Sequence, residues 1–447
     1  MVTNLQDDQD DQDAQDAQDA QDSQDTPAPQ HAPEAPDTPP PGCPAHAARL
    51  YGPDFRRRPD ETYQRIRQDS GPVAPVLLEG DIDAWFVLGY RETRQVLSDT
   101  ETFGRDPRRW NGWDSVPPDW PLTPWVAYSP MMTFTEGEEH QRRATAASEA
   151  LATVDPFVLR GHCERLADQL IDKFAGSGRA DLVYDYIYSV PTLATAELFG
   201  LSQDEAGLEA LAAGLTMSFL SNEEAIAGQQ RVAAYVTELV RAKRADPGPD
   251  LTSRFILNTP DLTEEQHTAD VMVLMAAALP LTSYWIGNTL RLMLTDERFA
   301  MTLSGNRRSI GEAMNEVLWA DSPLQNLIGR YATRDTDLGG RHIHAGDLVV
   351  LGLAAANADP LLWPDSPVGH AGNHSHVAFS GGDYGCPAGG PETARIIAET
   401  AIEVLLDRVP DLTLAVAPDE LRWVDSFWYR CLESLPVTFS PAPVTAG

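Results

Sequence analysis

The stretch HVAFSGGDYGCPAGG, residues 376–390, decides the fold of this chain because it places one cysteine, Cys386, in a glycine-rich turn. The turn follows a strand-like run, residues 376–379, and precedes a long helical segment. Glycines let a backbone fold closely around an object and turn its N–H groups inward. A sulfur among such donors at a helix start is expected to ionise, and a lone thiolate of this kind can hold a haem iron. The alternative is a small buried cysteine in a tight turn, and the loop alone leaves both interpretations open.

Composition and charge exclude several classes of protein. The chain has 447 residues, enough for one large core or about two to three average domains. Its four cysteines are too few and too scattered for a disulfide framework or a CxxC zinc site. The first residues lack the features of a signal peptide, and the longest apolar run, residues 271–281, is too short to span a bilayer. A net charge of −34 argues against nucleic acid or an anionic membrane as partner, so we expect a soluble, cytoplasmic protein.

The first 42 residues differ in composition from the rest. A Gln-Asp-Ala repeat is followed by a proline-rich piece, and residues 1–41 contain eleven acidic and no basic residues. Neither piece holds enough apolar surface to offset the entropy of ordering. We therefore expect residues 1–42 to be a disordered tail and residues 43–447 to form a single domain. The tail is a solubilising extension or, alternatively, an arm that docks a partner.

The periodicity of the body predicts mainly helix, with small β pieces near both ends. Residues 84–90 predict a short strand and residues 91–97 a helix, and a strand pair is expected within residues 340–351. Residues 137–320 show mostly helical spacing of apolar side chains, as do residues 392–406. The expected fold class is mainly α with small β-sheets (α+β).

From about Asp54 to Pro441 the chain resembles a bacterial cytochrome P-450. The stretch FSGGDYGCPA (379–388) is similar to the family's haem-loop pattern, F-G-x-G-x-H-x-C-x-G. Five further segments resemble the family in the expected order: AWFVL (84–88), IGNTL (286–290), GRYATRD (329–335), GGRHIHAGDLV (339–349) and AANADP (355–360). The resemblance implies the cytochrome P-450 fold with haem b as the cofactor.

The resemblance also implies which residues hold the haem. Cys386 matches the thiolate ligand of the iron, Arg330 an arginine that pairs with a haem propionate, and His140 a histidine near the propionates. Where the family has a second arginine this chain has Ala144, and Arg143 is a weaker candidate for that role. Alternatively, Arg330 is an ordinary surface arginine and His140 a solvated helix residue.

Within the haem loop, Phe379 and Gly382 match the family pattern, so the resemblance implies that they contact the cofactor. Tyr384 replaces the histidine that commonly contacts a propionate, and a phenol can still donate one hydrogen bond. Pro387, directly after the ligand, removes one backbone donor near the sulfur. These departures affect the redox tuning more than the ligation.

The chain also departs from the family's Glu-x-x-Arg motif, because it has Glu316 followed by Trp319 in place of the arginine. The segment after residues 363–364 has lost a further arginine. Since breaking a buried ion pair costs about 3–5 kcal/mol, we expect a repacked, tryptophan-filled site. The combination resembles a subgroup encoded in bacterial conservon operons.

The family's long central helix usually carries an acid and a threonine that relay protons, but here those positions align with Pro280 and Leu281. Proline breaks a helix hydrogen bond, so we expect a kink beside the haem. Thr282 or Ser283 takes over the catalytic role if the alignment with the family's helix is shifted by one or two residues. Otherwise both hydroxyls bond back to the helix backbone.

A competing interpretation of Cys386 is a zinc site with His370, His374 and His376, because three imidazoles and a thiolate can bind zinc. His376 occupies a position that the haem family also uses, and the other two lie in an apparently flexible loop.

The resemblance implies a monooxygenase that uses oxygen and two electrons from a ferredoxin-type donor to oxidise an apolar small molecule. The substrate cavity is expected between residues 277–281 and the segment near Trp110–Trp125, whose tryptophans belong to the core or stack on substrate. The alternative is a haem-binding sensor or interaction protein with little turnover, working with the signalling proteins of its operon.

Overall fold

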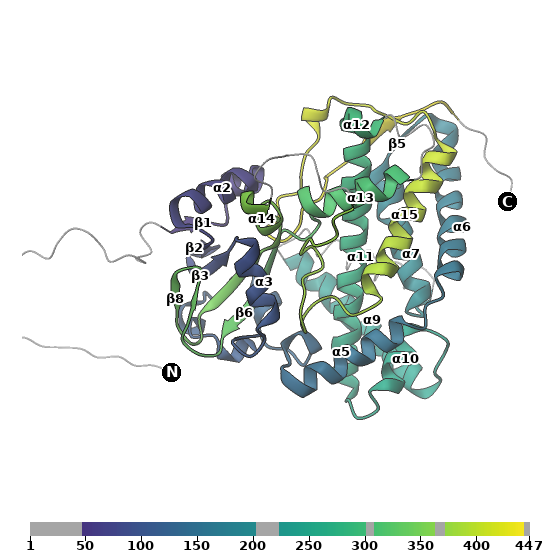
Figure 1. Cartoon of the computed structure of the whole chain (residues 1–447). Helices are drawn as coiled ribbons and strands as arrows, with labels where there is room; N and C mark the ends of the chain where they lie inside the picture. The colour runs from purple at the N-terminus through teal and green to yellow at the C-terminus, as the bar shows by residue number, and fades with distance from the viewer. Residues whose placement is uncertain (1–46, 203–222, 301–307, 363–371, 442–447) are drawn as a thin grey trace, which may run out of the picture. The chain divides into compact units, whose positions relative to one another are not determined.

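The computed structural model describes residues 47–202, 223–300, 308–362 and 372–441. These residues belong to one compact unit, Gly42–Gly447. Its fold is mainly helical with small sheets, as the sequence predicts (Figure 1). The predicted tail, residues 1–42, lies outside the described residues, so its disorder stays a prediction.

The larger sheet has six strands in the order β1-β2-β3-β9-β6-β4. Their bounds are β1 Ala48–Arg49, β2 Val73–Leu78, β3 Ile82–Val87, β9 Leu348–Gly352, β6 Asn326–Ala332 and β4 Phe103–Gly104. Strands β2 and β3 form an antiparallel hairpin, and β3 pairs in parallel with β9. The buried faces of these strands are apolar, with Phe86 and Val350 fully buried. The predicted strand at residues 84–90 and the helix after it are confirmed as β3 and α3 (Tyr90–Ser98).

The prediction of a strand pair within residues 340–351 was wrong. Both strands exist, but β8 (Arg341–Ile343) pairs with β7 (Thr336–Leu338), whereas β9 joins the large sheet. The prediction of a strand-like run at residues 376–379 was also wrong. The backbone N–H of Val377 there donates to Oδ1 of Asn357 (2.9 Å) in place of a ladder partner.

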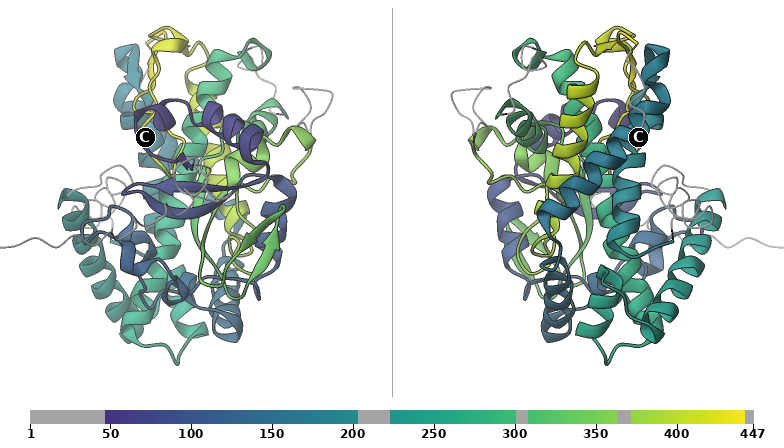
Figure 2. Two further views of the ribbon diagram at one scale, coloured as in Figure 1. Left: turned by 90° about the vertical axis from the view of Figure 1, so that its left-hand side faces the viewer. Right: turned by 90° about the vertical axis from the view of Figure 1, so that its right-hand side faces the viewer.

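The rest of the unit is mostly helix, as predicted for residues 137–320 and 392–406 (Figures 1 and 2). The longer helices are α2 Pro59–Ser70, α5 Gly137–Leu151, α6 Pro156–Phe174, α7 Ser189–Leu198, α9 Glu223–Ala245, α10 Leu251–Asn258, α11 Glu264–Thr295, α13 Arg308–Ala320 and α15 Gly390–Arg408. The shorter elements are α1 Pro53–Arg57, α4 Thr123–Val126, α12 Glu297–Ala300, α14 Leu353–Asn357, β5 Arg179–Asp181, β10 Thr413–Leu414 and β11 Pro436–Thr438. Helices α6 and α15 run side by side, and α11 packs against α7, α9, α13 and α15.

Helix α11 is the central element of this bundle. It begins with a capping box between Thr263 and Gln266 and continues as one helical segment through Pro280. By length and composition α11 is apolar enough to cross a membrane, a property that the expectation from residues 271–281 missed. However, 56% of its most apolar window is buried inside the protein, and a core helix passes the same test.

The tryptophans near the N-terminal sheet belong to the core. Trp110 lies 4.8 Å from Trp113 and 5.7 Å from Trp120, measured between ring centroids. The indole N–H of Trp120 donates to the carbonyl oxygen of Glu79 (2.6 Å). These rings pack with Val350 and Tyr331 over the sheet, so their geometry favours the core interpretation over substrate stacking.

Candidate functional site

A cavity of ≈ 290 Å³ lies between the helical bundle and the loop that carries Cys386. Helix α11 contributes Ala277, Ala278, Leu281, Thr282 and Trp285 to its wall. The other apolar side chains of the wall include Leu198, Phe199, Leu251, Phe255, Val273, Leu274, Leu318 and Ile397. The tryptophans at positions 110–125 are not among the lining residues that the structure describes.

Cys386 lines this cavity from the turn directly before α15. The N–H of Cys386 donates to the carbonyl of Phe379 (3.1 Å), and that of Gly385 donates to the carbonyl of Gly382 (3.0 Å). A side chain at Gly390 would come within 2.7 Å of the Cys386 sulfur, so this glycine gives the sulfur its space. The loop therefore brings the sulfur to the cavity wall by backbone bonds and small residues.

The expectation that this loop ionises the sulfur by itself was wrong. Although part of the Cys386 surface faces the cavity, dense protein around the sulfur raises the pKa of the thiol to about 11. The N–H groups of Gly385 and Cys386 bond to carbonyl oxygens, and that of Ala388 bonds to the Ser148 hydroxyl, instead of the sulfur. A thiol in such surroundings ionises when a metal cation binds it, because the bound cation stabilises the thiolate directly.

Gly382 and Phe379 have different positions in the loop. Gly382 adopts a φ of 65°, and a Cβ there would lie 1.9 Å from the carbonyl oxygen of Leu97. Its role in the structure is to let the loop approach α3 closely. Phe379 lines the cavity and packs against Trp285, with 5.8 Å between the ring centroids.

Arg330, on β6, is not a surface residue: its side chain is fully buried. Among the described residues none of its three side-chain nitrogens has a hydrogen-bond partner. Its guanidinium carbon lies 4.6 Å from the centroid of the Tyr384 ring, and Tyr384 lines the cavity. Burial, and then the nearby charge of Arg105, hold the pKa of Arg330 well below its usual range. A buried cation without a partner is costly, so this position calls for an anion.

Arg105 is the residue that the sequence analysis missed. It follows β4, is buried, and lines the same cavity. Its Nε donates to the carbonyl of Thr133 (3.1 Å) and its Nη1 to the carbonyl of Ile328 (3.2 Å). A single arginine after a two-residue strand has no periodicity or motif that would have identified it.

His140 is buried, which excludes the alternative of a solvated helix residue. Its Nδ1 lies 2.9 Å from the carbonyl oxygen of Met132, and its Nε2 lies 2.9 Å from that of Asp383 in the haem loop. The imidazole also packs on Tyr384, with 4.5 Å between the ring centroids. His140 therefore connects α5 to the loop and lines the cavity.

The structure places Arg143 away from the cavity, so its sequence-based role is corrected. Arg143 is not among the residues that line the cavity, and it donates to Asp270 on α11 (3.4 Å), to Glu139 (2.5 Å) and to the carbonyl of Pro130 (2.8 Å). Burial raises the pKa of Asp270 to about 7 in spite of Arg143. This pair joins two helices and has no geometry for holding a cofactor.

The two α11 hydroxyls differ in position. Thr282 lines the cavity, whereas the hydroxyl of Ser283 donates to the carbonyl of Leu279 (3.0 Å), one turn earlier. Ser283 is therefore bonded back to its helix.

The departure from Glu-x-x-Arg is filled by neutral contacts. Trp319 is buried, and its indole N–H donates to the carbonyl of Asn373 (2.8 Å). Asn315 donates to the same oxygen (3.1 Å), and His376 packs edge-on against Trp319 at 5.9 Å. Burial lowers the pKa of His376 to about 4.

The zinc interpretation gains no geometric support. His370 and the segment 363–371 lie outside the described residues. Within the described parts of the chain, Cys386 belongs to no cluster of metal-ligating side chains.

On its outer side the loop borders an open depression of ≈ 470 Å³. Gln141, Thr145 and Glu149 of α5 line it together with Asp383 and Cys386. Cys386 thus lies between the depression and the apolar cavity.

Comparisons with known proteins agree with this architecture. No family model matches the chain. The chain is 28% identical over 393 residues to cytochrome P-450 107B1 of Saccharopolyspora erythraea, covering 84% of this chain and 93% of that protein. It is 29% identical over 400 residues to the cytochrome P-450 monooxygenase PikC of Streptomyces venezuelae, covering 86% and 92%. The solved structure of CYP154C4 from Streptomyces sp. W2061 matches with a TM-score of 0.78 at 27% identity, covering 88% and 97%. The chain is therefore a member of the cytochrome P-450 family, whose cofactor is haem iron.

Proposed function

We propose that this protein is a haem-thiolate monooxygenase for an apolar small molecule, with Cys386 as the iron ligand. The observation that carries the proposal is the buried guanidinium of Arg330, which has no hydrogen-bond partner among the described residues and lies next to Arg105 and Tyr384, two residues that line the cavity together with Cys386. Haem fits this donor set because it brings both an iron that binds thiolate and carboxylates that need cations. When bound, a thiolate-ligated haem supplies oxygen activation.

The polar residues of the wall have separate roles in this proposal. Arg105 and Arg330 would neutralise the carboxylates of a bound haem. Tyr384 would move aside for these carboxylates or donate a hydrogen bond to them from its hydroxyl. His140 keeps the loop in position through the Asp383 carbonyl and lies next to Tyr384. Arg105 thereby takes the role of the family's second arginine, at whose position this chain has Ala144.

The substrate follows from the wall of the cavity. Phe199, Phe255, Val273, Leu274 and Leu281 offer apolar contact and no charge. Such a surface stabilises an apolar molecule by excluding water and gives little orientation by hydrogen bonds. The preferred substrate class is therefore an apolar small molecule.

Proton delivery is assigned to Thr282 because Pro280 and Leu281 carry no exchangeable side-chain proton. Thr282 lines the cavity, whereas the hydroxyl of Ser283 donates to the Leu279 carbonyl. Thr282 Oγ1 holds a proton or orients a water beside the reacting atoms.

Electrons are proposed to enter through the outer depression from a ferredoxin-type donor. Cys386 lines this depression, so a donor seated on α5 and the loop comes close to the sulfur without entering the substrate cavity.

The test is the spectrum of the reduced, CO-bound protein. We expect the strongly red-shifted Soret band of a thiolate-bound haem for the parent protein and for Cys431→Ala, a control at a second cysteine, which is buried. Cys386→Ala should lose this band. A parent protein without it, or a Cys386→Ala variant that keeps it, contradicts the assignment of the ligand.

A second candidate is a haem-binding sensor or interaction protein of a signalling operon, similar to the conservon-associated subgroup of the family. The neutral Trp319–Asn373 contact and the α11 segment with Pro280 favour it, because both depart from the catalytic pattern. Turnover with a ferredoxin system and a substrate library separates the two candidates. Sustained product formation excludes the sensor, whereas haem binding with only uncoupled electron use excludes the monooxygenase.

A further inference from the structure

The β7–β8 hairpin gathers two aspartates and two histidines on one face. Its register pairs Asp337 with His342 across the strands. Because side chains alternate along a strand, Asp335 and His344 belong to the same face, since each lies two residues along the chain from Asp337 and His342, respectively. The opposite face holds buried residues such as Leu338, whereas the four polar side chains are exposed.

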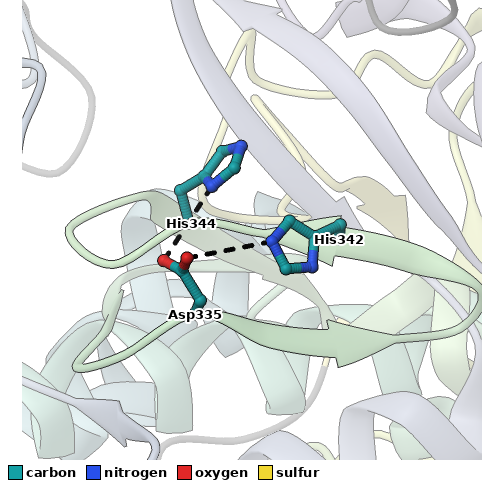
Figure 3. Close-up of side chains that lie close together, drawn as sticks. All are labelled: Asp335, His342 and His344. Carbon is teal, nitrogen blue, oxygen red and sulfur yellow. Dashed lines mark ion pairs between the residues drawn. The ribbon is translucent and has the colours of Figure 1, made fainter.

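Three of these side chains converge on one point (Figure 3). The Oδ1 atom of Asp335 lies 3.9 Å from Nδ1 of His344, and its Oδ2 atom lies 3.9 Å from Nε2 of His342. One ligand atom of each residue lies within 4.8 Å of the other two. Ligands of a tetrahedral zinc ion are about 3.3 Å apart, given bond lengths of about 2.0–2.1 Å. Exposed side chains close this difference by small rotations.

Two further contacts prepare the ligands. Oδ1 of Asp337 lies 3.0 Å from Nδ1 of His342, which fixes the ring so that Nε2 faces Asp335. A carboxylate behind the far nitrogen is the usual support of a metal-binding imidazole. The backbone N–H of Ala345 donates to Asp335 Oδ1 (2.8 Å). The carboxylate is therefore held in position by the hairpin backbone.

We propose that this hairpin binds a divalent transition-metal ion, best matched by Zn²⁺, through Asp335, Nε2 of His342 and Nδ1 of His344. Two imidazoles and one carboxylate suit zinc and its neighbours, whereas Ca²⁺ and Mg²⁺ prefer oxygen ligands. Asp337 is a positioning residue. The ion would connect the segment between β6 and β7, which holds Asp335, to β8 and the segment that leads into β9, which hold His342 and His344. None of the three lines the cavity next to Cys386.

The experiment is calorimetric titration of the untagged, haem-loaded full chain with Zn²⁺. We expect saturable binding of a single ion, no response to Mg²⁺, and loss of binding in the double variant His342→Ala/His344→Ala. Asp337→Asn should weaken binding by roughly 10- to 100-fold, the usual effect of removing such a support. His374→Ala, at an exposed histidine outside the hairpin, is the matched control and should bind like the parent.

Unchanged Soret and circular dichroism spectra show that each variant is folded. The variants alter exposed side chains, so we expect them to pass this check. Absence of Zn²⁺ binding by the parent chain overturns the proposal, and so does a double variant that binds Zn²⁺ as tightly as the parent. Equal loss in His374→Ala would move the site away from the hairpin and overturns it as well.

Discussion

Replacing Arg330 by methionine should have opposite effects on the apoprotein and on haem binding. The guanidinium of Arg330 is fully buried, and none of its nitrogens has a protein partner among the described residues. Methionine has a similar length and no charge, so Arg330→Met relieves the desolvation penalty while keeping the packing. With haem bound, the same change leaves a buried carboxylate without its cation.

The magnitudes follow from these two environments. An unpaired buried ion costs several kcal/mol, and the contact with the Tyr384 ring returns at most about 2 kcal/mol. We therefore expect the free energy of unfolding of the apoprotein to rise by about 1–3 kcal/mol. Removing one partner of a buried ion pair costs about 3–5 kcal/mol, so the Kd for haem should rise about 10²- to 10⁴-fold.

Urea denaturation of the apoprotein and haem transfer to a second apoprotein measure the two effects. Arg334→Met is the control, because Arg334 is exposed on the same segment and should change stability by no more than about 0.5 kcal/mol. A destabilised Arg330→Met apoprotein, or one that binds haem as tightly as the parent, refutes the reasoning.

Three further predictions concern other described residues. Burial raises the pKa of Asp270 to about 7, so between about pH 4 and pH 7 the folded protein keeps a proton that the unfolded chain has released, and its stability falls as pH rises through this range. Asp270→Asn should remove this fall, which is at most about 4 kcal/mol, and urea denaturation midpoints measured across pH will show it. Thr282→Val should leave haem binding unchanged but lower the product formed per electron, because hydroxyl-assisted proton transfer contributes about 10²- to 10⁴-fold. Gly382→Ala should destabilise the protein by more than about 1–2 kcal/mol and reduce haem occupancy, because the new Cβ would collide with the Leu97 carbonyl. Gly340 is the control: it also has a positive φ but open space around it, so Gly340→Ala should cost only the free energy of placing a non-glycine residue at positive φ, about 1–2 kcal/mol.

Each of these predictions has an outcome that contradicts it. An unchanged pH slope in Asp270→Asn would mean that another group carries the protonation. Full coupling of electrons to product in Thr282→Val would remove that hydroxyl from proton delivery. Equal stability of Gly382→Ala and Gly340→Ala would show that the loop does not need its close approach to α3.

The sequence located the fold and the loop because both depend on local patterns. The glycines around Cys386 and the helical spacing of α11 and α15 are short-range features, and they predicted the right elements. The ionisation of Cys386 could not be predicted in the same way. Ionisation depends on whether the loop N–H groups donate to the sulfur, and those of Gly385 and Cys386 donate to carbonyl oxygens instead.

The errors at the site come from long-range geometry. Arg143 lies three residues after His140, one residue before the expected position at Ala144, and there it pairs with Asp270 and does not line the cavity. Arg105 reaches the cavity from a loop next to β4 and meets Arg330 only because β4 pairs with β6. The strand after Gly346 joins β3 and not β8, because the chain turns into a different sheet. None of these relations is encoded within one stretch of sequence.

The attachment of the haem loop to α5 has a consequence for the order of folding. The loop is fixed to α5 by His140 and the Asp383 carbonyl (2.9 Å), and by the Ala388 N–H donating to Ser148 (3.1 Å). These partners are 243 and 240 residues apart. At a synthesis rate of about 5–20 residues per second, α5 leaves the ribosome roughly 10–50 s before the loop does. The cofactor-binding turn can therefore take its shape only near the end of translation, on a helix that is already there to receive it.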